Sequence, residues 1–213
     1  SDSIADNTLV IFQSDNGGPS GKNNVELDAN GGLRGNKGSI FEGGIRVPLV
    51  MRWPAMINQQ SELKVGASTD RVVDVTDLMP TFCELAGFSP PLGIDGVSIA
   101  PTLTGIGKQK TREFIIHEAG NGQSMIRGNH KLIRLKKSLE LYDLSVDHSE
   151  QNDISSSHPE LVKTLERLLL GERVDEPKGF ANTYHHWIGQ DGAITSGKDH
   201  WSDYQYSNAG ETY

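Results

Sequence analysis

Two adjacent side chains near the start of the chain, Asp15 and Asn16, are suited to chemistry as a pair. A carboxylate beside a carboxamide offers the hard oxygen ligands that Ca²⁺ or Mg²⁺ prefers. The glycine-rich stretch that follows carries the cations Arg34, Lys37 and Arg46, which could bind an anion. Taken singly, each signal is weak, because Asp-Asn-Gly-Gly is also a common turn and a lone lysine is usually solvated. Together the residue types indicate a metal ion paired with an anion.

Two apolar runs, residues 9–12 and 47–51, bracket this stretch. Apolar runs without alternation, bounded by Gly and Asn, predict strands that are buried on both faces. In open α/β sheets, ligands bind beyond the carboxyl ends of the strands, which is where Asp15 and Asn16 emerge. We therefore expect the two strands to position the site.

Short motifs follow one another in a fixed order along the chain. They are SDNGG at 14–18, LRGNKG at 33–38, EGGIRVP at 42–48, DVTDLMPT at 74–81, IRGNHKLI at 126–133 and ELYDL at 140–144. In this order they resemble the second half of the type I sulfatases, within the alkaline-phosphatase-like superfamily. The resemblance extends from about residue 6 to about residue 170.

The resemblance implies roles for individual residues. Asp15 and Asn16 look like two oxygen ligands of an active-site divalent cation, usually Ca²⁺, with Mg²⁺ as the alternative. Lys37 resembles the catalytic lysine that contacts the sulfate group, where its charge offsets charge developing on the sulfate oxygens and the leaving group. His117 ends an expected strand, in a loop that faces the substrate cleft in related enzymes, so it is either a substrate ligand or a solvated histidine.

Arg34 and Arg46 have two interpretations. Either could bind the anion, but the bidentate geometry of arginine favours a structural use that ties the glycine loop to a carboxylate such as Glu42. We therefore leave both arginines out of the predicted catalytic set.

By resemblance, the intact enzyme hydrolyses sulfate esters of aryl or carbohydrate compounds. A hydrated formylglycine attacks sulfur, the alcohol leaves, and the enzyme-bound sulfate is then eliminated. The family makes this aldehyde from a cysteine in Cys-x-Pro/Ala-x-Arg, and the only cysteine here, Cys83, lacks that context, so we expect no nucleophile in this chain. Residues 1–5 have no signal-peptide features. We expect a C-terminal portion that is inactive alone, with its N-terminal half truncated, removed by processing or supplied by another chain.

The expected fold is α/β: the C-terminal part of an alkaline-phosphatase-like sandwich with a mixed sheet, followed by a small four-stranded antiparallel sheet and a packed helix. Residues 1–105 belong to the catalytic domain, 106–175 form the small sheet and its helix, and 176–213 are an aromatic-rich tail. The meander is predicted by short apolar runs at 114–116, 124–126, 131–135 and 140–142, with turn residues between them. An apolar stripe between residues 161 and 169 predicts the packed helix. The tail shows neither helix nor strand period, and its aromatics either wrap the surface or line a carbohydrate subsite.

Charge and hydropathy limit the partners. A formal net charge of −8 without a lysine and arginine stripe argues against nucleic-acid binding. No apolar run is long enough to span a membrane. The resemblance implies a sulfated small molecule or glycan as substrate and a periplasmic or extracellular bacterial location. Two alternatives stay open: a phosphoester or phosphonate hydrolase of the same superfamily, and a non-catalytic module that binds a glycan or a partner.

Overall fold

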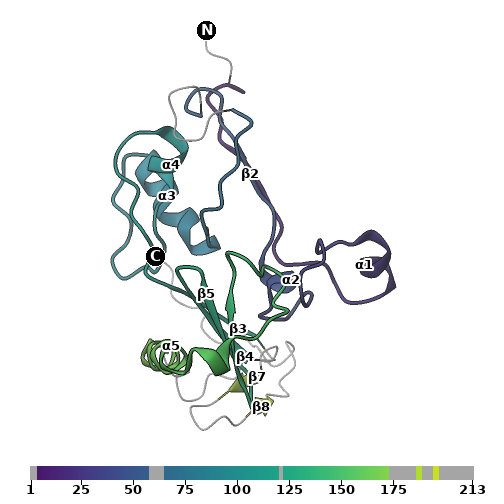
Figure 1. The fold of residues 1–213 in the computed structure, drawn as a ribbon. Coiled ribbons are helices and arrows are strands. Elements are labelled where there is room, and N and C mark those ends of the chain that lie inside the picture. The colour runs from purple at the N-terminus through teal and green to yellow at the C-terminus, as the bar shows by residue number, and fades with distance from the viewer. Residues whose placement is uncertain (1–3, 58–64, 120–121, 173–185, 189–193, 197–213) are drawn as a thin grey trace, which may run out of the picture. The chain divides into compact units, whose positions relative to one another are not determined.

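The computed structural model describes residues 4–57, 65–119, 122–172, 186–188 and 194–196 (Figure 1). The chain divides into two compact units. The first consists of residues 1–15 and 47–115, and the second of residues 16–46 and 116–213. None of the helices in the described ranges is long and apolar enough to cross a membrane.

The first unit contains a two-stranded ribbon and two α-helices. Strand β1 (Val10–Gln13) pairs antiparallel with β2 (Leu49–Arg52). The 3-10 helix η1 (Val75–Asp77) leads into α3 (Leu78–Leu85), which contacts α4 (Ala100–Thr104). The carboxylate of Asp77 is buried and joins these segments, because it accepts a hydrogen bond from the backbone of Val97 and pairs with Arg112.

The burial predicted for the first two strands is wrong. Both were expected to be covered on both faces, but Val10, Phe12 and Val50 are 49%, 67% and 58% exposed. They lie on one face of the ribbon, where Phe12 is the cross-strand partner of Val50. The physical reason is that β1 and β2 pair only with each other among the described residues, and no described layer covers this face. The opposite face is half-buried, so each strand alternates in exposure.

The second unit is built on the predicted four-stranded meander, whose first residue, Ile115, is the last residue of the first unit. Its strands are adjacent in chain order: β3 (Ile115–Ala119), β4 (Gly122–Arg127), β5 (His130–Arg134) and β6 (Leu139–Asp143). Strand β5 lies antiparallel to both β4 and β6. A short 3-10 helix, η2 (Ser155–Ser157), precedes α5 (Pro159–Gly171), which packs against β4 and β5 (Figure 1). Helix α5 buries Val162, Leu165 and Leu169, which confirms the predicted stripe.

Residues 16–46 also belong to this second unit. They include α1 (Lys22–Leu27) and the one-turn helix α2 (Glu42–Ile45). Ile40 is fully buried and forms a core cluster with the sheet residues Ile126, Ile133 and Tyr142. The glycine-rich stretch therefore packs on the small sheet. The domain limits at 105 and 175 stay predictions.

The aromatic-rich tail lies mostly outside the described residues. Within it, β7 (His186–Ile188) pairs antiparallel with β8 (Ile194–Ser196). The tail shows no strand period in its sequence, and these two strands are consistent with that, because strands of three residues are too short to show one. The proposed surface wrap or carbohydrate subsite of the tail lies outside the described residues.

Candidate functional site

Backbone hydrogen bonds hold the glycine-rich stretch as one framework. The amide of Gly17 donates to the carbonyl of Gly44 at 2.9 Å, and the amide of Lys37 donates to the carbonyl of Gly18 at 2.9 Å. The amide of Gly43 donates to the carbonyl of Arg34 at 2.7 Å. The two motifs that the sequence places far apart, SDNGG and EGGIRVP, therefore meet through their main chains.

This meeting is possible only because the contact residues are glycines. A Cβ on Gly17 would lie 1.8 Å from the carbonyl oxygen of Gly43, and a Cβ on Gly43 would lie 2.4 Å from the carbonyl oxygen of Gly35. Real Cβ atoms are not found so close to backbone. The framework thus depends on main chain packed directly against main chain.

The structure places Asn16 and Lys37 on this framework. Asn16 is half-buried and lies two residues before Gly18, to which the backbone of Lys37 is bonded. The side chain of Lys37 is exposed, and no described residue pairs with its ammonium group. Asp15 is exposed, follows β1 and precedes Asn16 directly in the chain. The sequence-predicted roles of all three residues stay predictions.

His117 lies in strand β3 of the second unit and is half-buried. It was predicted at the end of a strand, whereas β3 continues two residues further, to Ala119. Its role as a substrate ligand stays a prediction.

The hydrogen bonding of Asn16 shows which of its side-chain atoms could bind a metal ion beside the Asp15 carboxylate. The amide nitrogen of Asn16 donates to the carbonyl of Gly17 at 3.0 Å, so Oδ1 is the atom that would serve as a ligand. With the Asp15 carboxylate it would supply two hard oxygen atoms, whereas Ca²⁺ takes about six to eight. Among the described residues, no group of three or more His, Cys, Asp or Glu side chains is placed to hold a metal ion. Two oxygen atoms alone do not make such a site, so the metal-binding role of the pair stays a prediction.

Arg34 has the structural use that the sequence analysis favoured. Its Nη1 lies 2.8 Å from Glu140 Oε2 and 2.9 Å from the Tyr142 hydroxyl, and its guanidinium stacks 3.8 Å from the centroid of Phe41. Burial lowers the pKa of Arg34, but its bonds to Glu140 outweigh that effect and raise the pKa above the ordinary arginine value. The side chain thus fastens the glycine loop to strand β6.

Arg46 also pairs with the predicted carboxylate. Its Nη1 lies 3.5 Å from Glu42 Oε2, one helical turn earlier, and 3.3 Å from His148 Nδ1. The expected Arg46–Glu42 link is therefore confirmed.

A buried lysine near this loop was missed by sequence reasoning. Lys131 in β5 is fully buried, and its ammonium lies 2.8 Å from both Glu42 Oε1 and Glu150 Oε1. Burial raises the pKa of Glu150, and the neighbouring Lys131 opposes that rise. No local signal identifies such a lysine, because an apolar strand flanked by a turn usually exposes its charged residues.

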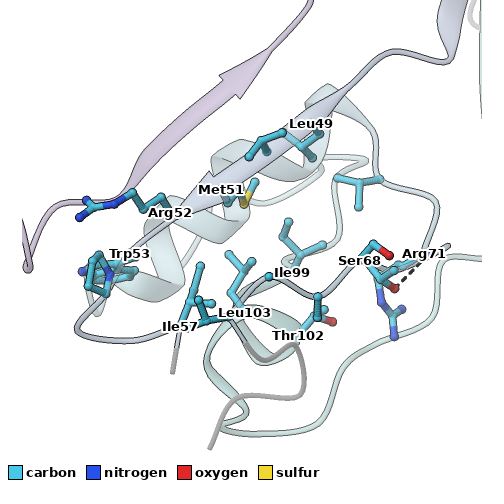
Figure 2. A pocket seen from close by; sticks show the side chains of 17 residues that line it. Leu49, Met51, Arg52, Trp53, Ile57, Ser68, Arg71, Ile99, Thr102 and Leu103 are labelled. Atoms are coloured by element: carbon cyan, nitrogen blue, oxygen red, sulfur yellow. Dashed lines mark hydrogen bonds between the residues drawn. The ribbon is translucent and has the colours of Figure 1, made fainter. Parts of the chain in front are cut away.

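A separate pocket of about 610 Å³ lies in the first unit. Its lining is mostly apolar, and Figure 2 shows Met51, Ile99 and Leu103 directed toward the same space. None of the four predicted site residues lines it. The candidate site is therefore the glycine framework and not this pocket.

Comparison with known proteins assigns the family. A family model described as Sulfatase matches residues 1–88. A sulfatase of Formosa agariphila is 35% identical over 178 residues, which cover 74% of this chain and 30% of that protein. An N-acetylgalactosamine-6-O-sulfatase of Bacteroides thetaiotaomicron is 30% identical over 78% of this chain and 36% of its own length. This chain belongs to the sulfatase family. It spans about a third of the length of these relatives and resembles their C-terminal part.

Solved structures agree with this assignment. The crystal structure of Ps i-CgsB in complex with k-i-k-neocarrahexaose has 28% sequence identity and a TM-score of 0.65, over 78% of this sulfatase chain and 36% of that chain. A structure of a protein bound to its substrate, D-glucosamine-2-N,6-O-disulfate, has 25% identity and a TM-score of 0.59 over 78% of this chain and 34% of that chain. The α/β class and the antiparallel sheet with its packed helix are therefore confirmed.

Proposed function

We propose that this chain supplies part of the active site of an enzyme that hydrolyses sulfate esters. The observation that supports it best is the hydrogen bond from the Lys37 amide to the Gly18 carbonyl, at 2.9 Å. Through this bond the backbone of Lys37 is held against Gly18, two residues after Asn16, and the Lys37 side chain is exposed. An exposed cation on a rigid backbone framework is suited to binding an oxyanion.

The chemistry of the site follows from the charges that these residues carry. The Lys37 ammonium would contact a sulfate oxygen and stabilise the charge that develops as the ester bond breaks. Asp15 and Asn16 would hold a Ca²⁺ or Mg²⁺ ion, which supplies further positive charge to the sulfate oxygens when it is bound. His117 would hydrogen-bond the sugar or the sulfate.

The proposed substrate class is a sulfated glycan. The Bacteroides relative acts, by its name, on 6-O-sulfated N-acetylgalactosamine, and a structural relative binds a disulfated glucosamine as its substrate. We propose a periplasmic or extracellular location for such an enzyme.

The proposal also includes the rest of a sulfatase polypeptide as partner. It would supply the formylglycine nucleophile and cover the apolar face formed by Val10, Phe12 and Val50. Peptide mass spectrometry of the native protein would test this part. Residues upstream of Ser1 that include Cys-x-Pro/Ala-x-Arg with an aldehyde in place of the thiol are the expected finding. A native chain that starts at Ser1, with no companion subunit, would contradict it.

Sulfate release by the native protein tests the activity. We expect release from 6-O-sulfated N-acetylgalactosamine or from D-glucosamine-2-N,6-O-disulfate, measured by ion chromatography. Lys37→Ala should lower kcat/KM by about 100- to 1000-fold, as for loss of one group that stabilises transition-state charge. Lys137→Ala is the matched control, because Lys137 is an exposed lysine of the same unit outside the framework. Wild-type activity in the Lys37 variant would refute the assignment of Lys37.

A further inference from the structure

Lys131 is the centre of a buried charge cluster in the second unit. Its Nζ lies 2.8 Å from one carboxylate oxygen of Glu42 and 2.8 Å from one of Glu150. Lys131 is 0% exposed, and each glutamate is 3% exposed. Ions removed from water in this way are retained only when they are closely paired. Arg46 adds a second cation at 3.5 Å from Glu42, so two carboxylates face two cations.

The cluster holds the start of helix α2. The second oxygen of Glu150 accepts a hydrogen bond from the backbone amide of Glu42 at 2.9 Å, and Glu42 is the first residue of α2. Helix α2 has only four residues, and its N-cap residue, Phe41, makes no side-chain capping hydrogen bond. A single turn of this kind has little stability of its own. Its position therefore depends on contacts with the rest of the unit, among them those with Lys131 and the two carboxylates.

Glu150 reaches this place through an unusual backbone conformation. Its φ is 55°, in the left-handed region that residues other than glycine rarely adopt. Conformations of this kind persist where the surrounding contacts outweigh their cost, and they are concentrated at functional sites.

Helix α2 in turn holds the framework that carries Lys37. The carbonyl of Gly44 accepts from the amide of Gly17, and the amide of Gly43 donates to the carbonyl of Arg34. The amide of Lys37 donates to the carbonyl of Gly18, the residue after Gly17. A continuous set of contacts therefore joins the buried ammonium of Lys131 to the backbone of Lys37.

We propose that Lys131 is a positioning residue for Lys37, which acts through Glu42, Glu150 and helix α2. This inference rests on the proposed function of Lys37. A cluster that served stability alone would have no advantage, because well-packed apolar residues usually replace a buried ion pair without loss. What the charges supply is one defined placement of α2 on the sheet.

Hydrogen exchange of the native protein tests the structural half of this inference without any activity assay. In Lys131→Met, the amides of residues 33–46 should exchange at least about tenfold faster, which corresponds to about 1.4 kcal/mol of lost local protection. The amides of β4 and β6 should change less. Arg112→Met is the matched control, since it breaks the buried ion pair with Asp77 in the other unit. Equal exchange of residues 33–46 in Lys131→Met and wild type would overturn the inference.

A double-mutant cycle tests the functional half. Lys131→Met should lower kcat by about 100-fold, the size expected when a catalytic group is misplaced by about 1 Å. In a Lys37→Ala background the same change should cost less than about twofold, because there is no ammonium left to misplace. If the two substitutions lower kcat independently, so that their fold-changes multiply in the double variant, the positioning role is overturned and the sulfatase proposal stays intact. An inactive protein, or a Lys37→Ala variant with full activity, would refute the proposed function, and the exchange result would still decide whether Lys131 restrains α2.

A charge-balanced variant keeps the test decisive if Lys131→Met fails to fold. Lys131→Met combined with Glu150→Gln removes one charge of each sign and leaves Glu42 paired with Arg46. This variant should fold, and residues 33–46 should still exchange faster because the lysine bridge is missing. Protection equal to wild type would again overturn the inference.

Discussion

Replacing Gly17 with alanine tests the close packing of the glycine framework. The new Cβ would lie 1.8 Å from the carbonyl oxygen of Gly43, 2.8 Å from its carbonyl carbon and 3.0 Å from the Cα of Gly44. All three atoms belong to the main chain, so no flexible side chain can move aside. The two segments must separate, and the 2.9 Å hydrogen bond from the Gly17 amide to the Gly44 carbonyl is lost.

The expected cost has two parts. Overpacking at a closely packed position costs about 1 to 3 kcal/mol. Loss of the buried backbone hydrogen bond adds about 1 kcal/mol. Gly17→Ala should therefore lower the free energy of unfolding by about 2 to 4 kcal/mol, if the framework unfolds together with the sheet beneath it.

Urea unfolding of the native protein, followed by circular dichroism, measures this change. Gly171→Ala is the matched control: Gly171 is the last residue of α5, nothing lies within 4 Å of its added Cβ, and its φ is not in the left-handed region. That control should be neutral or slightly stabilising, because alanine is the better helix former. An unfolding free energy for Gly17→Ala within about 0.5 kcal/mol of wild type would refute the close packing.

Two further predictions concern the sheet that supports the framework. Arg34→Met should destabilise the protein by about 1 to 2 kcal/mol, since it removes hydrogen bonds to Glu140 and Tyr142. Arg167→Met, at the exposed arginine of α5, is the control and should have little effect in the same urea assay. Burial raises the pKa of Asp153, but hydrogen bonds from the backbone amides of Leu141 and Ser155 outweigh it and hold the pKa below the ordinary value. A depressed carboxyl pKa stabilises the fold above the unfolded-state pKa of about 4, and this contribution disappears as the pH falls through the folded-state pKa. Asp153→Asn should therefore be less stable than wild type near neutral pH, with a difference that shrinks below about pH 4; a constant difference across that range would contradict the pKa argument.

The sequence by itself determined the family, the strands of the small sheet and the amphipathic helix α5. These features depend on residue types at short range: the motif around Lys37, runs of apolar residues between turns, and leucines spaced three or four apart. The same local reasoning anticipated that Arg34 and Arg46 bind carboxylates, because arginine is the residue best suited to such pairs.

Only the tertiary structure decided which surfaces are covered and which charges are buried. The apolar run around Phe12 has the composition of a fully buried strand, yet burial depends on the layers that pack against it, and one face of β1 has no described layer. The role of Lys131 was equally hidden, since Glu42, its partner, lies 89 residues away in the sequence. A lysine in a strand is normally solvated, and its burial becomes favourable only when folding brings two carboxylates within hydrogen-bonding distance of it.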